Sequence, residues 1–268
     1  MKWRRVISAG SLAEELLSHG RYTLTRAEAE SRLGSAPAAT YMALRRLAQQ
    51  GWLCMPHAGF YVIVDPQHRP AGTLPPEWFI RELMQYLKRP YYVGLLSAAQ
   101  MHGAAHHQPQ EFQVVIPARR LRPIVSGNVR IHFFGKGPFE KARLIEVRTP
   151  TGMMRVSSPE TTAWDLVRYR KAGGGLENVS TVLSELAEKL DPIRLRDTVS
   201  SHGDVLVAQR LGYILDHVAH RGLTQGIAKW VGGKGPHLRR LNPSVPAEGA
   251  PVSRKWSLLV NKQIEAEA

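Results

Sequence analysis

The chain has 268 residues, of which 43% are hydrophobic and 22% charged, a composition typical of a globular protein with a buried core. Lysine and arginine outnumber acidic residues by 36 to 22, so the formal net charge is +14 and polyanions are attracted to the chain. The single cysteine, Cys54, excludes an internal disulfide and a cysteine-based zinc site. No apolar run approaches the ~20 residues of a membrane-spanning helix. We therefore expect a cytoplasmic protein without metal or cofactor, with nucleic acid as its natural partner.

Residues 11–65 predict a winged helix-turn-helix. Helical spacing of apolar residues, short polar caps and glycine stops are followed here by two β-like runs. In chain order, we expect a helix from 12 to about 19 capped by Ser11, a helix over 26–33 capped by Thr25, a helix over about 37–50 ended by Gly51, and a hairpin of runs 52–55 and 60–64. This arrangement places the third helix in the major groove of duplex DNA, although some winged helices bind only proteins.

The expected third helix has an apolar face and a small, basic face. Leu44, Leu47 and Ala48 form the apolar face, which we expect to pack inward. Small residues near the start of such a helix allow close approach to base edges, and arginines suit guanine edges or phosphates. The candidate DNA contacts are Arg4, Arg5, Ser35, Ala38, Thr40, Tyr41, Arg45 and Arg46, together with His57 in the turn of the wing.

A proline-rich segment at 65–76 predicts a boundary between two domains with independent cores. We assign residues 1–70 to the winged helix and residues 77–268 to a C-terminal domain. The second domain is expected to have helices within 77–103, strands within 110–157 and further helices within 158–220. The predicted fold class is α+β, with a small, mostly antiparallel sheet and several helices in the C-terminal domain.

Positive charge also gathers around the predicted strands of the second domain. The residues concerned are Arg119, Arg120, Arg122, Arg130, Lys136, Lys141 and Arg143. A surface for phosphates and a site for an acidic partner are both consistent with this charge. His102 and His106 have the i, i+4 spacing of zinc ligands, but Gly103 interrupts a helix there and no carboxylate or cysteine accompanies them, so we expect a loop. No nucleotide loop, nuclease carboxylate pair or Gly-x-Ser-x-Gly elbow is present, so we expect no enzymatic activity.

Several stretches, taken in order, resemble the AbiEi antitoxin family, the transcriptional-regulator half of type IV toxin–antitoxin systems. None of these stretches is specific for the family alone, but their order over nearly the whole chain is specific for it. These stretches are 47–53 with 59–62 in the winged helix, and 91–103, 157–165, 210–215 and 254–261 in the second domain.

The resemblance implies that the winged helix binds inverted repeats in the promoter of its own operon and represses it. It also implies that the C-terminal domain counters a nucleotidyltransferase-like toxin without forming a stable complex, as in abortive infection during phage defence. The arginine-rich loop after Pro117 matches no family motif. Two alternatives stay open: a winged helix fused to a nuclease-like enzyme, and a plain repressor without a toxin partner.

Overall fold

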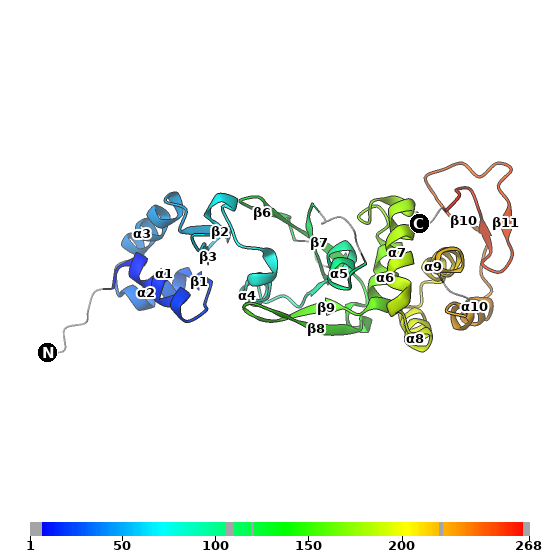
Figure 1. The fold of residues 1–268 in the computed structure, drawn as a ribbon, viewed down its shortest axis with the longest axis horizontal. Helices are drawn as coiled ribbons and strands as arrows, with labels where there is room; N and C mark the ends of the chain where they lie inside the picture. Colours follow the sequence, from blue (N-terminus) through cyan, green and yellow to red (C-terminus); the bar gives the residue numbers. More distant parts are fainter. Residues whose placement is uncertain (1–6, 105–109, 119–120, 220–221, 265–268) are drawn as a thin grey trace.

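The computed structural model of the protein describes residues 7–104, 110–118, 121–219 and 222–264. The molecule is elongated, with a small helical unit at its N-terminal end, a sheet in the middle and a group of helices at the other end (Figure 1). Three hydrophobic clusters follow the same order along the molecule within these residues.

The N-terminal end of the molecule is a winged helix. Three helices pack beside an antiparallel sheet with the strand order β1-β3-β2. The elements are α1 (Ala9–Ser18), β1 (Thr23–Thr25), α2 (Arg26–Leu33), α3 (Pro37–Gln49), β2 (Leu53–His57) and β3 (Phe60–Ile63). Leu12, Leu44 and Ile63 are completely buried in its core. The predicted order of helices and hairpin is therefore confirmed.

Short polar side chains and one glycine set the limits of these helices. Thr25 caps α2 as predicted, because its Oγ1 accepts a hydrogen bond of 3.1 Å from the backbone of Glu28. Helix α1 begins earlier than predicted: its N-cap is Ser8, whose Oγ accepts a 3.0 Å hydrogen bond from the backbone of Ser11. The turn between α2 and α3 uses Gly34 at a φ of 61°, a conformation that glycine adopts readily.

A six-stranded mixed sheet with the order β6-β7-β5-β4-β9-β8 occupies the middle of the molecule. Its strands are β4 (Tyr92–Val93), β5 (Phe112–Pro117), β6 (Ile124–Ser126), β7 (Val129–Lys136), β8 (Leu144–Thr149) and β9 (Gly152–Ser157). The pairs β5–β7 and β4–β9 are parallel, and the other neighbouring pairs are antiparallel. The predicted mixed domain with a mostly antiparallel sheet is confirmed, with β4 and β6 as strands that were not predicted.

The helices of the second half fall into two groups. Near the sheet are α4 (Ile80–Tyr86) and α5 (Leu95–Met101), and beyond it are α6 (Pro159–Arg168), α7 (Gly175–Leu186), α8 (Pro192–His202), α9 (Val205–Val218) and α10 (Gln225–Gly232). Short 3-10 helices are η1 (Arg69–Ala71), η2 (Pro76–Trp78), η3 (Phe139–Lys141) and η4 (Ala187–Lys189). Trp164, Leu183 and Leu211 are buried in the core between these helices. No helix in the described part of the chain combines the length and hydrophobicity needed to cross a membrane.

Strand β3 is shared by two cores, which corrects the expectation of two independent ones. All four of its residues are buried. Tyr61 and Ile63 belong to the core of the winged helix, whereas Phe60 and Val62 are buried with Phe79 and other residues of the second half. Successive residues of a strand point to opposite faces, so one strand completes both cores. The proline-rich segment therefore joins two units that already pack against each other.

The C-terminal segment returns onto α9 and forms the short strands β10 (Arg239–Arg240), β11 (Val252–Ser253) and β12 (Leu258–Leu259). Trp256 is 1% exposed, and a Cβ on Gly212 of α9 would stand only 2.1 Å from its ring. The side-chain amide of Gln209 donates to the backbone oxygens of Trp256 (2.9 Å) and His237 (3.0 Å). The absence of a side chain at Gly212 thus lets the indole lie directly on the helix.

We predict that Gly212→Ala destabilises the protein, although alanine is the better helix former by about 1 kcal/mol. The new methyl group must displace a buried indole, and overpacking of this kind typically costs ~1–3 kcal/mol. Denaturant unfolding measures the difference in free energy. Gly232→Ala is the matched control, because a Cβ there meets nothing within 4 Å. Equal or greater stability of Gly212→Ala would show that Trp256 does not pack on this glycine in solution.

Candidate nucleic-acid interface

Helix α3 presents a stripe of exposed residues away from the core of the winged helix. Ala38, Tyr41 and Arg45 are exposed at the spacing that places residues on one helix face, and Arg46 and Ser35 are exposed beside them. The opposite face contains Leu44, which is completely buried. The predicted division into a packed face and a small, basic face is therefore present in the structure.

The start of α3 offers unpaired backbone donors. Its N-cap, Ala36, has no side chain that could accept a hydrogen bond from the first turn, and Pro37 occupies the first helical position. The first N–H groups of a helix lack intrahelical acceptors and carry partial positive charge, so an uncapped and exposed helix start favours a phosphate group. This feature and the two arginines lie on the same helix.

Two contacts around the stripe differ from the sequence-based prediction. Thr40 was a candidate contact, but it is completely buried and its hydroxyl lies 2.7 Å from that of Ser35, so it supports the turn instead of facing a ligand. Arg26 was not predicted, yet its guanidinium lies 5.6 Å from the ring centroid of Tyr41. Arg26 is also paired with Glu30 at 2.8 Å, which leaves its charge partly neutralised.

The turn of the wing lies against the second half of the molecule. Tyr86 of α4 donates a 3.0 Å hydrogen bond to the backbone oxygen of Ala58, and its ring centroid is 6.0 Å from that of His57. A Cβ on Gly59 would stand 2.7 Å from the Tyr86 hydroxyl. His57 is exposed in a turn that α4 holds in place, so its contact with DNA stays a prediction, whereas α3 adds an exposed stripe and an uncapped helix start. We therefore centre the candidate interface on α3.

Among the described residues of the predicted basic surface of the C-terminal domain, one lysine is buried and two arginines are already paired with carboxylates. Lys136 is buried, Arg130 lies 3.6 Å from Glu111, and Arg143 lies 3.5 Å from Asp197. The exposed residues Arg122 and Lys141 belong to different segments, before β6 and in η3. Four further candidates lie outside the described residues, namely Arg4, Arg5, Arg119 and Arg120.

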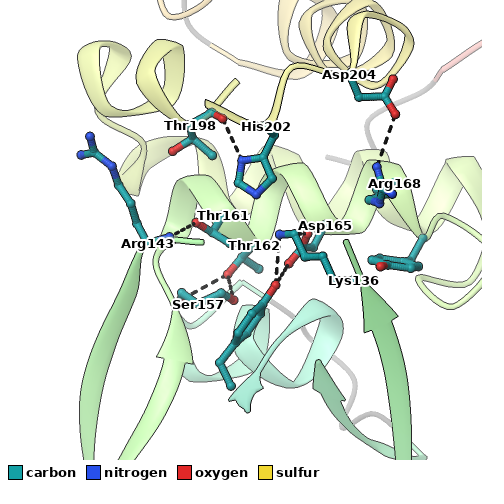
Figure 2. A network of polar contacts seen from close by, with 12 residues as sticks. Lys136, Arg143, Ser157, Thr161, Thr162, Asp165, Arg168, Thr198, His202 and Asp204 are labelled. Atoms are coloured by element: carbon teal, nitrogen blue, oxygen red, sulfur yellow. Dashed lines mark hydrogen bonds and ion pairs between the residues drawn. The ribbon is translucent and has the colours of Figure 1, made fainter. Parts of the chain in front are cut away.

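Lys136 forms a buried network with Asp165 and Tyr92 (Figure 2). Its Nζ lies 2.7 Å from Oδ1 of Asp165 and 3.0 Å from the Tyr92 hydroxyl, which donates to Oδ2 of Asp165 at 2.7 Å. Lys136 and Asp165 are 1% and 0% exposed. Burial lowers the pKa of Lys136 while Asp165 opposes that shift, and burial beside Asp165 raises the pKa of Tyr92 well above its usual value. The three groups satisfy one another and leave no carboxylate open to a substrate.

Segments that carry the family resemblance meet around this network. Tyr92 and Asp165 belong to two of them, and the same two segments are joined by a 2.8 Å hydrogen bond between Nε2 of His102 and the backbone oxygen of Ser157. Figure 2 shows Ser157 and Thr162 beside the network, where their hydroxyl oxygens lie 2.7 Å apart. These polar residues are buried, so they hold the sheet to α6 and are not a binding surface.

The family model of the AbiEi antitoxin C-terminal domain matches residues 92–217. Residues 92–217 are thus similar to this antitoxin domain, and we call them the AbiEi domain below. This AbiEi domain includes β4–β9 and α5–α9, and therefore the whole buried network. The crystal structure of the Rv2827c protein from Mycobacterium tuberculosis has a similar fold, with a TM-score of 0.69 and 17% sequence identity over 93% of this chain and 90% of that chain. No curated protein matches the chain significantly.

We predict that Arg45→Ala and Arg46→Ala each weaken binding to promoter DNA by ~1–3 kcal/mol if they contact bases or adjacent phosphates. Both side chains are exposed, so thermal stability should not change. Leu44→Ala should instead destabilise the fold by ~2–5 kcal/mol, because this leucine is fully buried. Affinity comes from an electrophoretic or fluorescence titration, and stability from thermal unfolding. Loss of folding in the arginine variants would show that the helix faces are assigned incorrectly.

A second prediction concerns the buried network. Asp165→Ala leaves the ammonium of Lys136 buried without its counter-ion, which typically costs ~3–5 kcal/mol of folding free energy. The double variant Lys136→Met/Asp165→Leu removes both charges of the pair and should be more stable than either Lys136→Met or Asp165→Leu alone. Urea unfolding measures all four variants. The control is Glu177→Ala, which removes the exposed partner of Lys262 and should change stability by at most ~1 kcal/mol. Additive effects of the two single changes would argue against the pairing.

Proposed function

We propose that the protein is a DNA-binding antitoxin of a type IV toxin–antitoxin system that represses its own operon. One observation carries the proposal: the same chain joins a winged helix with an exposed, basic α3 to the AbiEi domain. In this proposal, residues 1–70 bind inverted repeats in the promoter, and residues 77–268 counter the toxin.

Charge and helix geometry support the DNA-binding part. The net charge of +14 attracts a polyanion over a long range, and α3 adds two exposed arginines and an uncapped N-terminus at short range. Base contacts from the exposed stripe would then select the operator, since the major groove presents a distinct pattern for each base pair.

The antitoxin part rests on the AbiEi domain. The proposed partner is a nucleotidyltransferase-like toxin encoded beside this gene, which the protein counters in the cytoplasm without forming a stable complex. The proposal assigns no catalysis to the protein. Asp165 and Lys136 could suggest a nuclease-like pair, but they are buried and bonded to each other, so they are not available to a phosphodiester.

The test separates the two activities in the full-length chain. The double variant Arg45→Ala/Arg46→Ala should release a promoter reporter from repression, because it loses contacts to DNA. It should still rescue growth when the neighbouring toxin is expressed from a separate promoter, because the AbiEi domain is unchanged. For the wild-type protein, log affinity for promoter DNA should fall linearly with log salt, by about 0.9 per neutralised phosphate.

Arg194→Ala is the matched control, because Arg194 is an exposed arginine on α8 and its loss removes the same charge at a distance from α3. It should repress and rescue like the wild type. Absence of DNA binding by the wild type at low salt would overturn the DNA-binding part. Repression without rescue would overturn the antitoxin part and favour the plain repressor.

A further inference from the structure

A cavity of about 480 Å³ lies between α4 and the hairpin formed by β8 and β9. Its volume is within the range of small-molecule sites in proteins. Figure 1 shows α4 beside one end of these strands. The lining residues that matter for its chemistry are Arg81, Gln85, Arg89, Tyr91, Glu146 and Arg155, and we call this cavity the α4 arginine pocket.

The fold brings three arginines to this pocket from separate segments. Arg81 lies on α4, and Arg89 follows the helix end, where Lys88 has a φ of 52° and the N–H of Arg89 donates to the backbone oxygen of Met84 at 3.0 Å. Arg155 comes from β9, at the position paired with Glu146 of β8. Gln85 lies one helical turn after Arg81 on α4 and also lines the pocket.

These arginines make no close polar contact in the described part of the chain, although the charge of Arg81 acts on the carboxyl of Glu82. Among the described residues, the side chains of Arg81, Arg89 and Arg155 form neither an ion pair nor a hydrogen bond. Other arginines do pair with carboxylates, namely Arg21, Arg26, Arg32, Arg130, Arg143, Arg168 and Arg196. The lining of the pocket thus carries three positive charges against the one negative charge of Glu146. The guanidinium group of an arginine without a carboxylate partner can donate two parallel hydrogen bonds to an anion such as phosphate.

Tyr91 supplies a further donor to the wall of the pocket. It is 6% exposed, and its hydroxyl finds no acceptor in the described part of the chain. Burial raises the pKa of Tyr91 to about 12, an effect that the neighbouring backbone amide of Arg155 partly opposes, so the hydroxyl keeps its proton. Burial also raises the pKa of the nearby Glu82, an effect that the charge of Arg81 partly opposes. A buried polar group without a partner is uncommon and fits a missing ligand.

We infer that the α4 arginine pocket binds the phosphate group of a small phosphorylated metabolite of mononucleotide size. The three guanidinium groups would hold the phosphate oxygens, with Tyr91 donating a further hydrogen bond from the wall. A small ligand is favoured over a DNA backbone because the donors line a concave cavity, one of them on a largely buried side chain. The inference is independent of the proposed function, since binding requires neither toxin nor operator.

The test is isothermal titration of the full-length protein with AMP, inorganic phosphate and adenosine at 150 mM salt. We expect saturable binding of one AMP per chain, weaker binding of phosphate and none of adenosine. Arg89→Gln and Arg155→Gln should each weaken AMP binding at least about tenfold, because each removes a charge-assisted hydrogen bond. Tyr91→Phe should weaken it less, and thermal unfolding establishes that each variant is folded.

Arg194→Gln is the matched control, since it removes an exposed arginine outside the pocket, and it should bind AMP like the wild type. Failure of AMP and phosphate to bind the wild type at millimolar concentration would overturn the inference. Equal losses in Arg194→Gln and the pocket variants would also overturn it, because they would indicate general charge attraction. The same holds if the pocket variants lose affinity only for duplex DNA, which would make the pocket part of the DNA interface.

Discussion

The arrangement of the second half depends on the buried contact between Lys136 and Asp165. Lys136 ends β7, Asp165 lies in α6 and Tyr92 lies in β4, so the contact joins two strands of the sheet to the helices beyond it. A charge taken out of water is tolerated only where its partner is correctly placed. Any sliding of α6 along the sheet would leave an ammonium or a carboxylate buried alone. We infer that this requirement fixes the position of the helices on the sheet more strictly than apolar packing, which tolerates small shifts.

The buried contact between Lys136 and Asp165 also involves two of the segments that resemble the AbiEi family. Segments 91–103 and 157–165 supply Tyr92 and Asp165, and Ser157 of the second segment is also bonded to His102 and Val93 of the first. Part of the family resemblance therefore falls on buried residues that hold this domain together.

Much of the fold follows from local patterns in the sequence. Helical periodicity and the cap at Thr25 predicted the helices of the winged unit, and β5, β7, β8 and β9 lie within the predicted strand range 110–157. Strands β1, β4 and β6 were not predicted. They contain two or three residues each, too few to show alternation, and exist because longer neighbouring strands offer backbone partners. Such strands are determined by tertiary structure.

The candidate sites, like the strands, could be predicted from the sequence only where a local pattern determines them. The exposed face of α3 could be predicted, because one helix and its periodicity determine which side faces solvent. Lys136 could not, since lysine is usually exposed and its buried partner lies 29 residues away on another element. The α4 arginine pocket was also missed: Arg81 and Arg89 are near each other in the sequence, but only the placement of β9 beside α4 adds Arg155.

The double role of β3 limits how this protein can be rebuilt by recombination. A winged helix exchanged as a unit with another regulator would bring a wing strand suited to one core only, and the second half would lose the side chains that Phe60 and Val62 insert into it. Whole-domain exchange is therefore costly, whereas the outward stripe of α3 touches neither core. Substitutions on this stripe can therefore change the outer surface of the winged unit without disturbing the domain that β3 completes.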